Sequence, residues 1–174
     1  MPVINKIVFL EKIDSSRKGL FVDRDGVINL KPAEHDYVKL WKEFFFVEGI
    51  KELLLTYIHQ GYRIIVITNQ RGIARGQISQ KNFEEISHKM SNCLKEMGVP
   101  ISAIYYCPHE VEENCSCRKP KPGLILAAVK DFNLDIKNSI LIGDSMSDIE
   151  AGKAAKVGKL IMLNTNTQSI LNTY

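Results

Sequence analysis

Three short apolar runs in this chain each end in polar side chains, and this repeated pattern is the strongest constraint on its fold. The runs and the residues that follow them are Gly19–Val22 with Asp23, Tyr62–Ile67 with Thr68, and Ser139–Gly143 with Asp144. A short apolar run bounded by polar residues is typical of a buried strand. Each predicted strand therefore presents polar groups at its carboxyl end.

Helical patterns separate these strands. Apolar residues recur at helical spacing in four segments, at residues 47–60, 79–97, 122–132 and 148–157. Strand and helix therefore alternate, which predicts an α/β fold with a Rossmann-like open parallel sheet and helices on both faces. Ligands of such sheets bind outside the carboxyl ends of the strands, so Asp23, Thr68 and Asp144 are expected to meet there.

Length and composition fit one such unit. The 174 residues, 45% of them hydrophobic, can bury one good core, and no linker-like or repeated segment divides them. We expect a single domain over residues 1–174, with its core at about 18–164 and peripheral segments at 1–17 and after Asn164. No segment approaches the roughly twenty apolar residues of a membrane helix, so a cytoplasmic protein without membrane contacts is expected.

Two carboxylates close the first predicted strand. Asp23 and Asp25 flank Arg24, and a turn at Gly26 lets both acids face one point, where they repel unless a cation lies between them. Mg²⁺ prefers such oxygen ligands. The same letters occur in calcium loops and plain turns. A calcium loop needs further acids downstream, however, and the apolar segment 27–30 lacks them.

A second ligand cluster lies downstream. Cys107, His109, Cys115 and Cys117 place three of the four cysteines of the chain within eleven residues. Soft ligands at this spacing indicate a closed, structural Zn²⁺ site, with a disulfide or scattered buried thiols as the alternative. Four protein ligands leave no open position on the ion, so the chemistry is expected elsewhere. Reduced cysteines also agree with the cytoplasm.

The zinc-stapled loop leads directly into Arg118 and Lys119. Acids that bind a metal, together with Thr68, Lys119 and helix N-termini that bind oxyanions, make a phosphoryl-transfer site. The spacing before the first helix and within the zinc loop leaves no room for a separate cap domain. An open pocket is therefore expected, bounded by residues 27–40, residues 70–78 and the zinc loop.

These elements together resemble the haloacid dehalogenase superfamily of phosphatases. The likeness rests on Asp23-x-Asp25, on Thr68, on Lys119 in Arg-Lys-Pro, and on Gly143-Asp144-x-x-x-Asp148. Residues 21–29, 67–76 and 115–123 are similar in particular to the group of heptose bisphosphate and histidinol-phosphate phosphatases. The resemblance spans about residues 19–164.

The resemblance implies a role for each matching residue. Asp23 would attack phosphorus and form an aspartyl-phosphate, and Asp25 would act as general acid and base. The second role requires a pKa for Asp25 well above its ordinary value of about 3.9. Thr68 and Lys119 would hold the phosphoryl oxygens.

Metal and substrate contacts are implied in the same way. Mg²⁺ would be held by Asp23, Asp144 and the backbone carbonyl of Asp25, while Asp148 would orient Lys119. Nine residues are expected to bind substrate: Arg24, Glu34, His35, Tyr37, Asn69, Gln70, Arg71, Arg118 and Ser145. Ser145 departs from the pattern, since many relatives carry lysine after the metal-binding aspartate.

The implied activity is removal of the 7-phosphate of D-glycero-D-manno-heptose 1,7-bisphosphate, a small sugar phosphate, by a monomeric enzyme. Histidinol phosphate and a polynucleotide end are alternative substrates, and a non-catalytic zinc-stapled binding module is the alternative from another class. The net charge of +3 is dispersed, and the aromatic cluster Trp41, Phe44, Phe45 and Phe46 is expected to pack rather than to bind bases. Nucleic acid is therefore not an expected partner.

Overall fold

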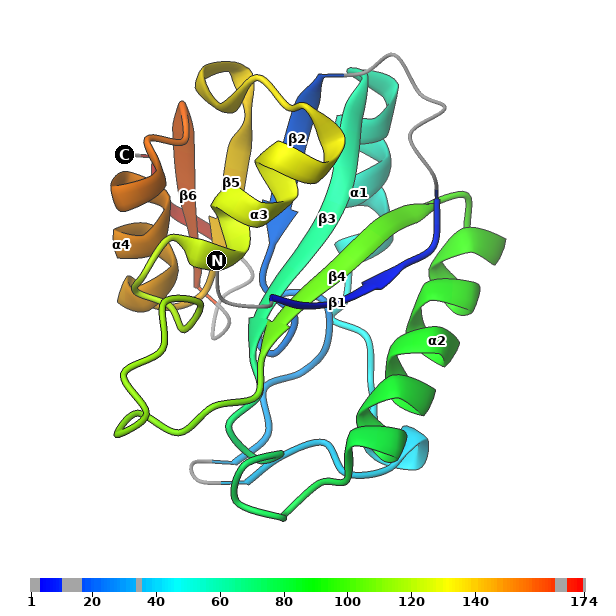
Figure 1. Ribbon diagram of the computed structural model, residues 1–174. Coiled ribbons are helices and arrows are strands. Elements are labelled where there is room, and N and C mark those ends of the chain that lie inside the picture. The colour runs from blue at the N-terminus through cyan, green and yellow to red at the C-terminus, as the bar shows by residue number, and fades with distance from the viewer. Residues whose placement is uncertain (1–3, 11–16, 34–35, 165–168, 174) are drawn as a thin grey trace.

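The computed structural model describes residues 4–10, 17–33, 36–164 and 169–173. Within these residues the strands are β1 (Asn5–Val8), β2 (Lys18–Val22), β3 (Tyr62–Asn69), β4 (Ile101–Cys107), β5 (Ile140–Gly143), β6 (Lys159–Asn164) and β7 (Ser169–Thr173). They form one sheet in the order β1-β4-β3-β2-β5-β6-β7 (Figure 1). The inner strands are parallel, whereas β1 and β7 run antiparallel to their neighbours at the two edges.

Helices cover both faces of the sheet. They are α1 (Ile50–His59), α2 (Gln80–Glu96), α3 (Gly123–Phe132) and α4 (Met146–Ala155), with short 3-10 turns η1 (Trp41–Glu43) and η2 (Ile136–Asn138). Leu54 of α1 and Phe83 of α2 pack in one hydrophobic core, and Leu124 of α3 and Ile149 of α4 pack in a second. The predicted α/β fold with helices on both faces is therefore confirmed, and no helix among the described residues is long and apolar enough to cross a membrane.

Local sequence explains where the elements begin and end. The β-branched run of β3 has both faces covered, so residues 63–68 are all buried. The Ser79 side chain caps α2 by accepting a hydrogen bond from the Asn82 amide, and Ser145 and Asp148 form a capping box at the start of α4. The observed helices lie within three residues of the predicted segments.

The edges of the sheet differ from the prediction. Segments before residue 17 and after Asn164 were expected to be peripheral, yet β1 pairs with β4 and β7 pairs with β6. That expectation was wrong for these strands. Edge strands of four or five residues carry too short an alternation to stand out in the sequence.

The order of the strands places the functional end of the sheet. The chain runs outward from β2 through β3 to β4, and then returns to β5 on the other side of β2. The loops after β2 and β5 therefore diverge, which is the position where open α/β sheets bind ligands. In the described part of the connection from β2 to α1, η1 is the only helix, and Trp41 stacks on Phe44 at 5.0 Å. The connection thus has no cap domain, as predicted.

Candidate active site

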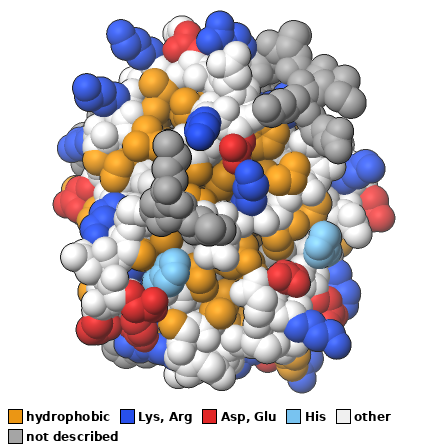
Figure 2. Space-filling model, viewed as in Figure 1, with side chains coloured by type: hydrophobic (Ala, Val, Ile, Leu, Met, Phe, Trp, Pro, Cys, Tyr) orange, Lys and Arg blue, Asp and Glu red, His pale blue; other side chains and the backbone are white. Residues whose placement is uncertain are grey.

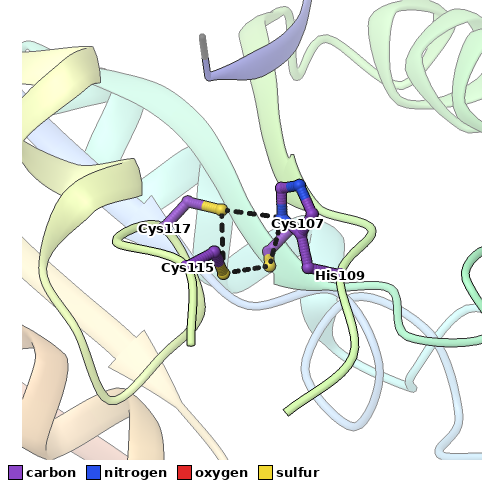
Figure 3. A group of neighbouring side chains, drawn as sticks. All are labelled: Cys107, His109, Cys115 and Cys117. Atoms are coloured by element: carbon purple, nitrogen blue, oxygen red, sulfur yellow. Dashed lines mark hydrogen bonds between the residues drawn. The ribbon is translucent and has the colours of Figure 1, made fainter. Parts of the chain in front are cut away.

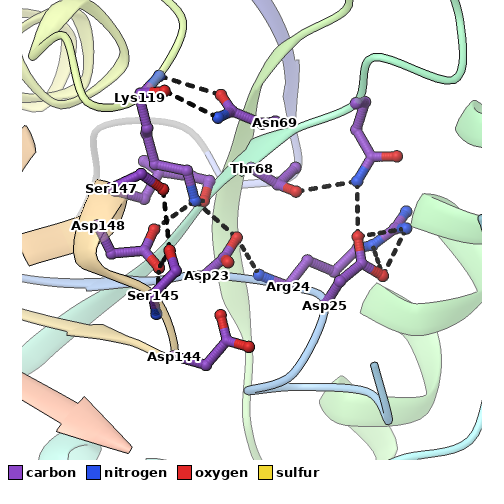
Figure 4. Close-up of polar contacts among 12 residues, drawn as sticks. Asp23, Arg24, Asp25, Thr68, Asn69, Lys119, Asp144, Ser145, Ser147 and Asp148 are labelled. Carbon is purple, nitrogen blue, oxygen red and sulfur yellow. Dashed lines mark hydrogen bonds and ion pairs between the residues drawn. The ribbon is translucent and has the colours of Figure 1, made fainter. Parts of the chain in front are cut away.

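Three acids gather at the point where β2 and β5 diverge. Asp23 follows β2, Asp144 follows β5 and Asp148 lies in α4, and one carboxylate oxygen from each lies within 4.8 Å of those from the other two (Figure 4). Burial raises the pKa of Asp23 to about 7, and the charge of Asp148 adds to this effect although Lys119 opposes it. Negative charge is therefore in excess here, which is the condition that a bound cation relieves.

Lys119 is buried between two of these acids. Its Nζ lies 2.8 Å from Asp23 Oδ1 and 2.6 Å from Asp148 Oδ1, and it also donates to the carbonyl of Ile67. The other oxygen of Asp148 accepts hydrogen bonds from the amide and hydroxyl of Ser145. Asp148 is thus committed to Lys119 and to the α4 cap, which makes Asp23 and Asp144 the better metal ligands of the three.

The turn after β2 approaches Asp144 closely. Gly26 has a φ of +91°, and a Cβ on this residue would lie 2.2 Å from Asp144 Oδ2. Only glycine therefore fits, because it combines a left-handed backbone with contact against the carboxylate. The turn places the backbone after Asp25 beside the carboxylate of Asp144, which lies close to that of Asp23. These oxygen donors suit Mg²⁺.

Asp25 is held by neighbouring donors. Arg24 Nη2 lies 2.8 Å from both carboxylate oxygens of Asp25, and the side-chain amides of Asn29 and Gln70 also donate to them. Burial alone would raise the pKa of Asp25, but the charge and hydrogen bonds of Arg24 outweigh it and hold the pKa below its ordinary value. The expected elevated pKa of Asp25 is therefore not observed, because its sequence neighbour folds back onto it.

Several of the residues predicted to bind substrate make contacts around Asp25, Thr68 and Lys119. Gln70 donates one amide to both Asp25 and Thr68, and Arg24 lies buried over the ring of Phe83. Asn69 clamps the backbone of Lys119, with its Nδ2 donating to the Lys119 carbonyl and its Oδ1 accepting from the Lys119 amide, each at 3.1 Å.

A pocket of about 320 Å³ opens beside Asp25. It is lined by Asp25, Lys31, Pro32, Ala33, Asp36, Tyr37, Asn69, Arg71 and Arg118. The lining comes from residues 27–40 and 70–78, two of the three segments expected to bound the pocket, together with Asp25, Asn69 and Arg118. Of the predicted substrate-binding residues, Tyr37, Asn69, Arg71 and Arg118 line the pocket; Glu34 and His35 lie outside the described residues. Among described residues Arg24, Gln70 and Ser145 are not part of the lining.

Lys31 is the charged residue that sequence reasoning missed. Its Nζ lies 2.6 Å from Asp144 Oδ2, although 55% of its side chain is exposed. Partial burial would lower the pKa of Lys31, but the hydrogen bond and charge of Asp144 raise it. No motif marks this lysine, because only the return of the loop after β2 brings it to the end of β5.

The cysteine and histidine cluster also forms (Figure 3). Sγ of Cys107 lies 3.5 Å from Sγ of Cys115 and 3.5 Å from Nδ1 of His109, while Sγ of Cys117 lies 3.5 Å from Sγ of Cys115. These separations approach the edge of about 3.8 Å of a tetrahedron with Zn–S bonds of about 2.3 Å. They exceed the roughly 2.05 Å of a disulfide bond, and all four cysteines are free.

The cluster fixes the loop that carries Lys119. Cys107 is the last residue of β4, so the loop starts at the sheet and returns two residues before Lys119. At the far side α3 presses against the loop, since a Cβ on Gly123 would lie 2.3 Å from the carbonyl oxygen of Ser116. Sheet, cluster and helix together hold Lys119 beside Asp23.

Known proteins resemble the chain in sequence and in structure. The family described as Polynucleotide kinase 3 phosphatase matches residues 20–168. The D-glycero-beta-D-manno-heptose-1,7-bisphosphate 7-phosphatase of Helicobacter pylori (strain J99 / ATCC 700824) is 44% identical over 153 residues, covering 87% of this chain and 86% of the relative. The corresponding alpha-heptose enzyme of Campylobacter jejuni is 44% identical over 147 residues, covering 84% and 83%.

A solved structure agrees with the family match and with the two sequence relatives. The D,D-heptose 1,7-bisphosphate phosphatase from B. bronchiseptica, complexed with magnesium and phosphate, superposes with a TM-score of 0.76 at 30% identity and covers 87% of this chain and 84% of its own. Fold and site thus define a phosphatase of the haloacid dehalogenase superfamily, a hydrolase of phosphoric monoesters. The chain belongs to the Polynucleotide kinase 3 phosphatase family, which matches residues 20–168.

Proposed function

We propose that this protein removes the 7-phosphate of D-glycero-D-manno-heptose 1,7-bisphosphate. The observation that carries the proposal is the pocket beside Asp25, whose lining includes the cationic side chains of Lys31, Arg71 and Arg118. The pocket acids are already neutralised, because Asp25 pairs with Arg24 and Asp36 pairs with Lys39. A substrate with a second phosphate fits this charge pattern. A heptose 1,7-bisphosphate is also the substrate in the names of the relatives at 44% identity.

The proposed first step forms a bond between an Asp23 oxygen and phosphorus and breaks the bond between phosphorus and the sugar oxygen. Asp25 gives its proton to the departing oxygen, and it takes a proton from the water that later hydrolyses the aspartyl-phosphate. Lys119 and Thr68 bind the phosphoryl oxygens, where negative charge develops. Arg24 opposes protonation of Asp25 and thereby sets the pH range of this step.

Mg²⁺ suits the same site. Asp23, Asp144 and the backbone carbonyl of Asp25 would hold the ion, which supplies positive charge that stabilises the phosphoryl group during transfer. The excess of buried carboxylates around Asp23 supports this assignment. Ionised Asp23 is the nucleophilic form, so compensation of its charge also prepares it for attack.

Zn²⁺ is proposed at the second cluster. Cys107, His109, Cys115 and Cys117 would complete a closed tetrahedral shell with a structural role. The ion would hold Lys119 and Arg118 at the site through the loop geometry described above. Purified protein should then contain about one zinc per chain, the stoichiometry of a single closed site.

A polynucleotide end is the second candidate substrate, favoured by the description of the matching family. On the face drawn in Figure 2, Lys and Arg side chains are scattered over the outline and the middle of the view, with acidic side chains among them, rather than gathered in a stripe. Trp41 stacks on Phe44, Phe46 meets both rings edge-on, and all three pack against the core, so they are not presented to bases. Phe45 was expected to pack with them, but it is exposed, and that part of the expectation was wrong. These features support the small sugar phosphate instead.

Phosphate release tests the proposal. Both anomers of the heptose 1,7-bisphosphate should be hydrolysed with a higher kcat/KM than histidinol phosphate or a 3′-phosphorylated oligonucleotide, and EDTA should abolish turnover until Mg²⁺ is restored. If either competing substrate is preferred, the heptose assignment is wrong. Unchanged turnover in EDTA would contradict the magnesium site.

A further inference from the structure

Lys31 occupies two environments at once. Its Nζ lies 2.6 Å from Asp144 Oδ2, yet its side chain is 55% exposed and lines the substrate pocket with Arg71 and Arg118. A lysine stem is long and flexible, so its ammonium group can change partners without movement of the backbone. Lys31 is thus placed at the border between the metal-binding acids and the pocket.

Asp144 needs a cation, and Lys31 is the one that it contacts. The Asp144 side chain is only 4% exposed, so its charge is largely removed from water. A buried carboxylate without a compensating cation is costly. A divalent ion held by Asp144 satisfies the same need and repels a nearby ammonium group. Lys31 and the divalent ion therefore compete for one carboxylate.

Among the described residues that line it, the pocket offers Lys31 no unpaired acid in exchange. Of the two acids that line it, Asp25 is paired with Arg24 and Asp36 with Lys39. Within the described residues Arg118 forms no ion pair, and the Arg71 guanidinium is 4.0 Å from its nearest carboxylate oxygen, on Glu110. A ligand that fills this pocket must therefore bring its own negative charge.

We propose that Lys31 exchanges partners during binding. It holds Asp144 while no divalent ion is bound, and once the ion takes Asp144 it binds the anionic group of the substrate remote from the reacting phosphate. This inference rests on the proposed function, whose substrate carries a second phosphate.

The first test needs no substrate. Binding of Mn²⁺ to metal-free protein, followed by the electron paramagnetic resonance signal of the free ion, compares the wild type with Lys31→Met, Lys31→Arg and Lys42→Met. Lys42 is an exposed lysine of the same loop outside the pocket. Lys31→Met should bind Mn²⁺ about two- to fivefold more tightly, the range of a partly exposed ion pair, whereas Lys31→Arg and Lys42→Met should match the wild type.

The second test measures the remote anion. Lys31→Met should raise KM for heptose 1,7-bisphosphate by about tenfold or more, as expected for the loss of a charged hydrogen bond, and should raise KM for heptose 7-phosphate much less. Lys31→Arg should restore the bisphosphate KM.

The exchange is overturned if Lys31→Met leaves Mn²⁺ affinity unchanged, or if it weakens both sugar phosphates equally. A wild-type enzyme that hydrolyses neither sugar phosphate would refute the proposed function and with it the remote-phosphate contact. The Mn²⁺ comparison would still decide the competition for Asp144.

Discussion

Arg24 donates hydrogen bonds from Nη2 to both carboxylate oxygens of Asp25, its neighbour in sequence, and each oxygen lies 2.8 Å away. Arg24 is itself buried, so this ion pair is largely shielded from water. The residue expected to deliver a proton is thus held in its ionised form, while the expected nucleophile Asp23 is held toward its neutral form by burial. If Asp23 and Asp25 have the proposed roles, the reaction has to reverse both tendencies.

Replacing Arg24 should move the pH dependence. Burial is the largest influence on Asp25 and raises its pKa, so Arg24→Met should raise the pKa from its lowered value. A general acid works only while protonated, and kcat/KM should therefore begin to fall at higher pH in the variant. The pH profile of kcat/KM measures this directly.

A matched control is Arg63→Met, which removes another buried arginine, stacked on Phe132 in the other core. It should leave the position of this decline unchanged. A decline that stays in place in Arg24→Met would mean that Asp25 is not the titrating acid.

Asp23→Asn should abolish phosphate release at nearly constant shape. An amide cannot form the phosphoryl intermediate, so kcat should fall by at least about 10³-fold. Circular dichroism and zinc content should match the wild type. Turnover near the wild-type level would contradict the role of Asp23 as nucleophile.

Gly26→Ala should damage metal binding more than folding. The new Cβ would meet Asp144 Oδ2, and a φ of +91° adds backbone strain of roughly 1 kcal/mol or more. Gly76→Ala is the matched control, because Gly76 has a φ of +65° but nothing within 4 Å of a Cβ. The thermal shift caused by Mg²⁺ should vanish in Gly26→Ala and persist in Gly76→Ala. Equal shifts in both variants would argue against Asp144 as a ligand.

Cys115→Ser should release zinc, lower Tm by roughly 5 °C or more and reduce activity, because the loop that positions Lys119 loses its tether. Cys93→Ser serves as control, since Cys93 is a half-buried thiol of α2 outside the cluster. Elemental analysis and differential scanning fluorimetry give the two readouts. Full zinc content in Cys115→Ser would remove Cys115 from the ligand set.

The sequence predicts the acids and Lys119 well because each follows a strong local signal. Asp23 and Asp144 end apolar strands, and the topology of a parallel sheet then brings them together. The inner strands β4 and β6 were not predicted, although Ile101–Cys107 is a buried run rich in Ile and Tyr. That run could have been found, whereas the pairing of the edge strands could not.

Side-chain partners were harder to predict than positions. The lowered pKa of Asp25 depends on Arg24 folding back and on Gln70 arriving from the end of β3, which no local pattern encodes. In the sequence Lys31 looks like an ordinary solvated lysine. Its contact with Asp144 forms because the loop after β2 returns to the end of β5. A single domain over residues 1–174 stays a prediction.

The close contact between Gly123 and Ser116 bears on how a ligand enters and leaves the pocket. Because α3 packs closely against the zinc loop, and Asn69 holds the backbone of Lys119, the segment that carries Arg118 and Lys119 is fixed against the rest of the fold. Under the proposed function, we expect the sugar phosphate to enter and its product to leave past the opposite wall, formed by residues 31–33 and 36–37.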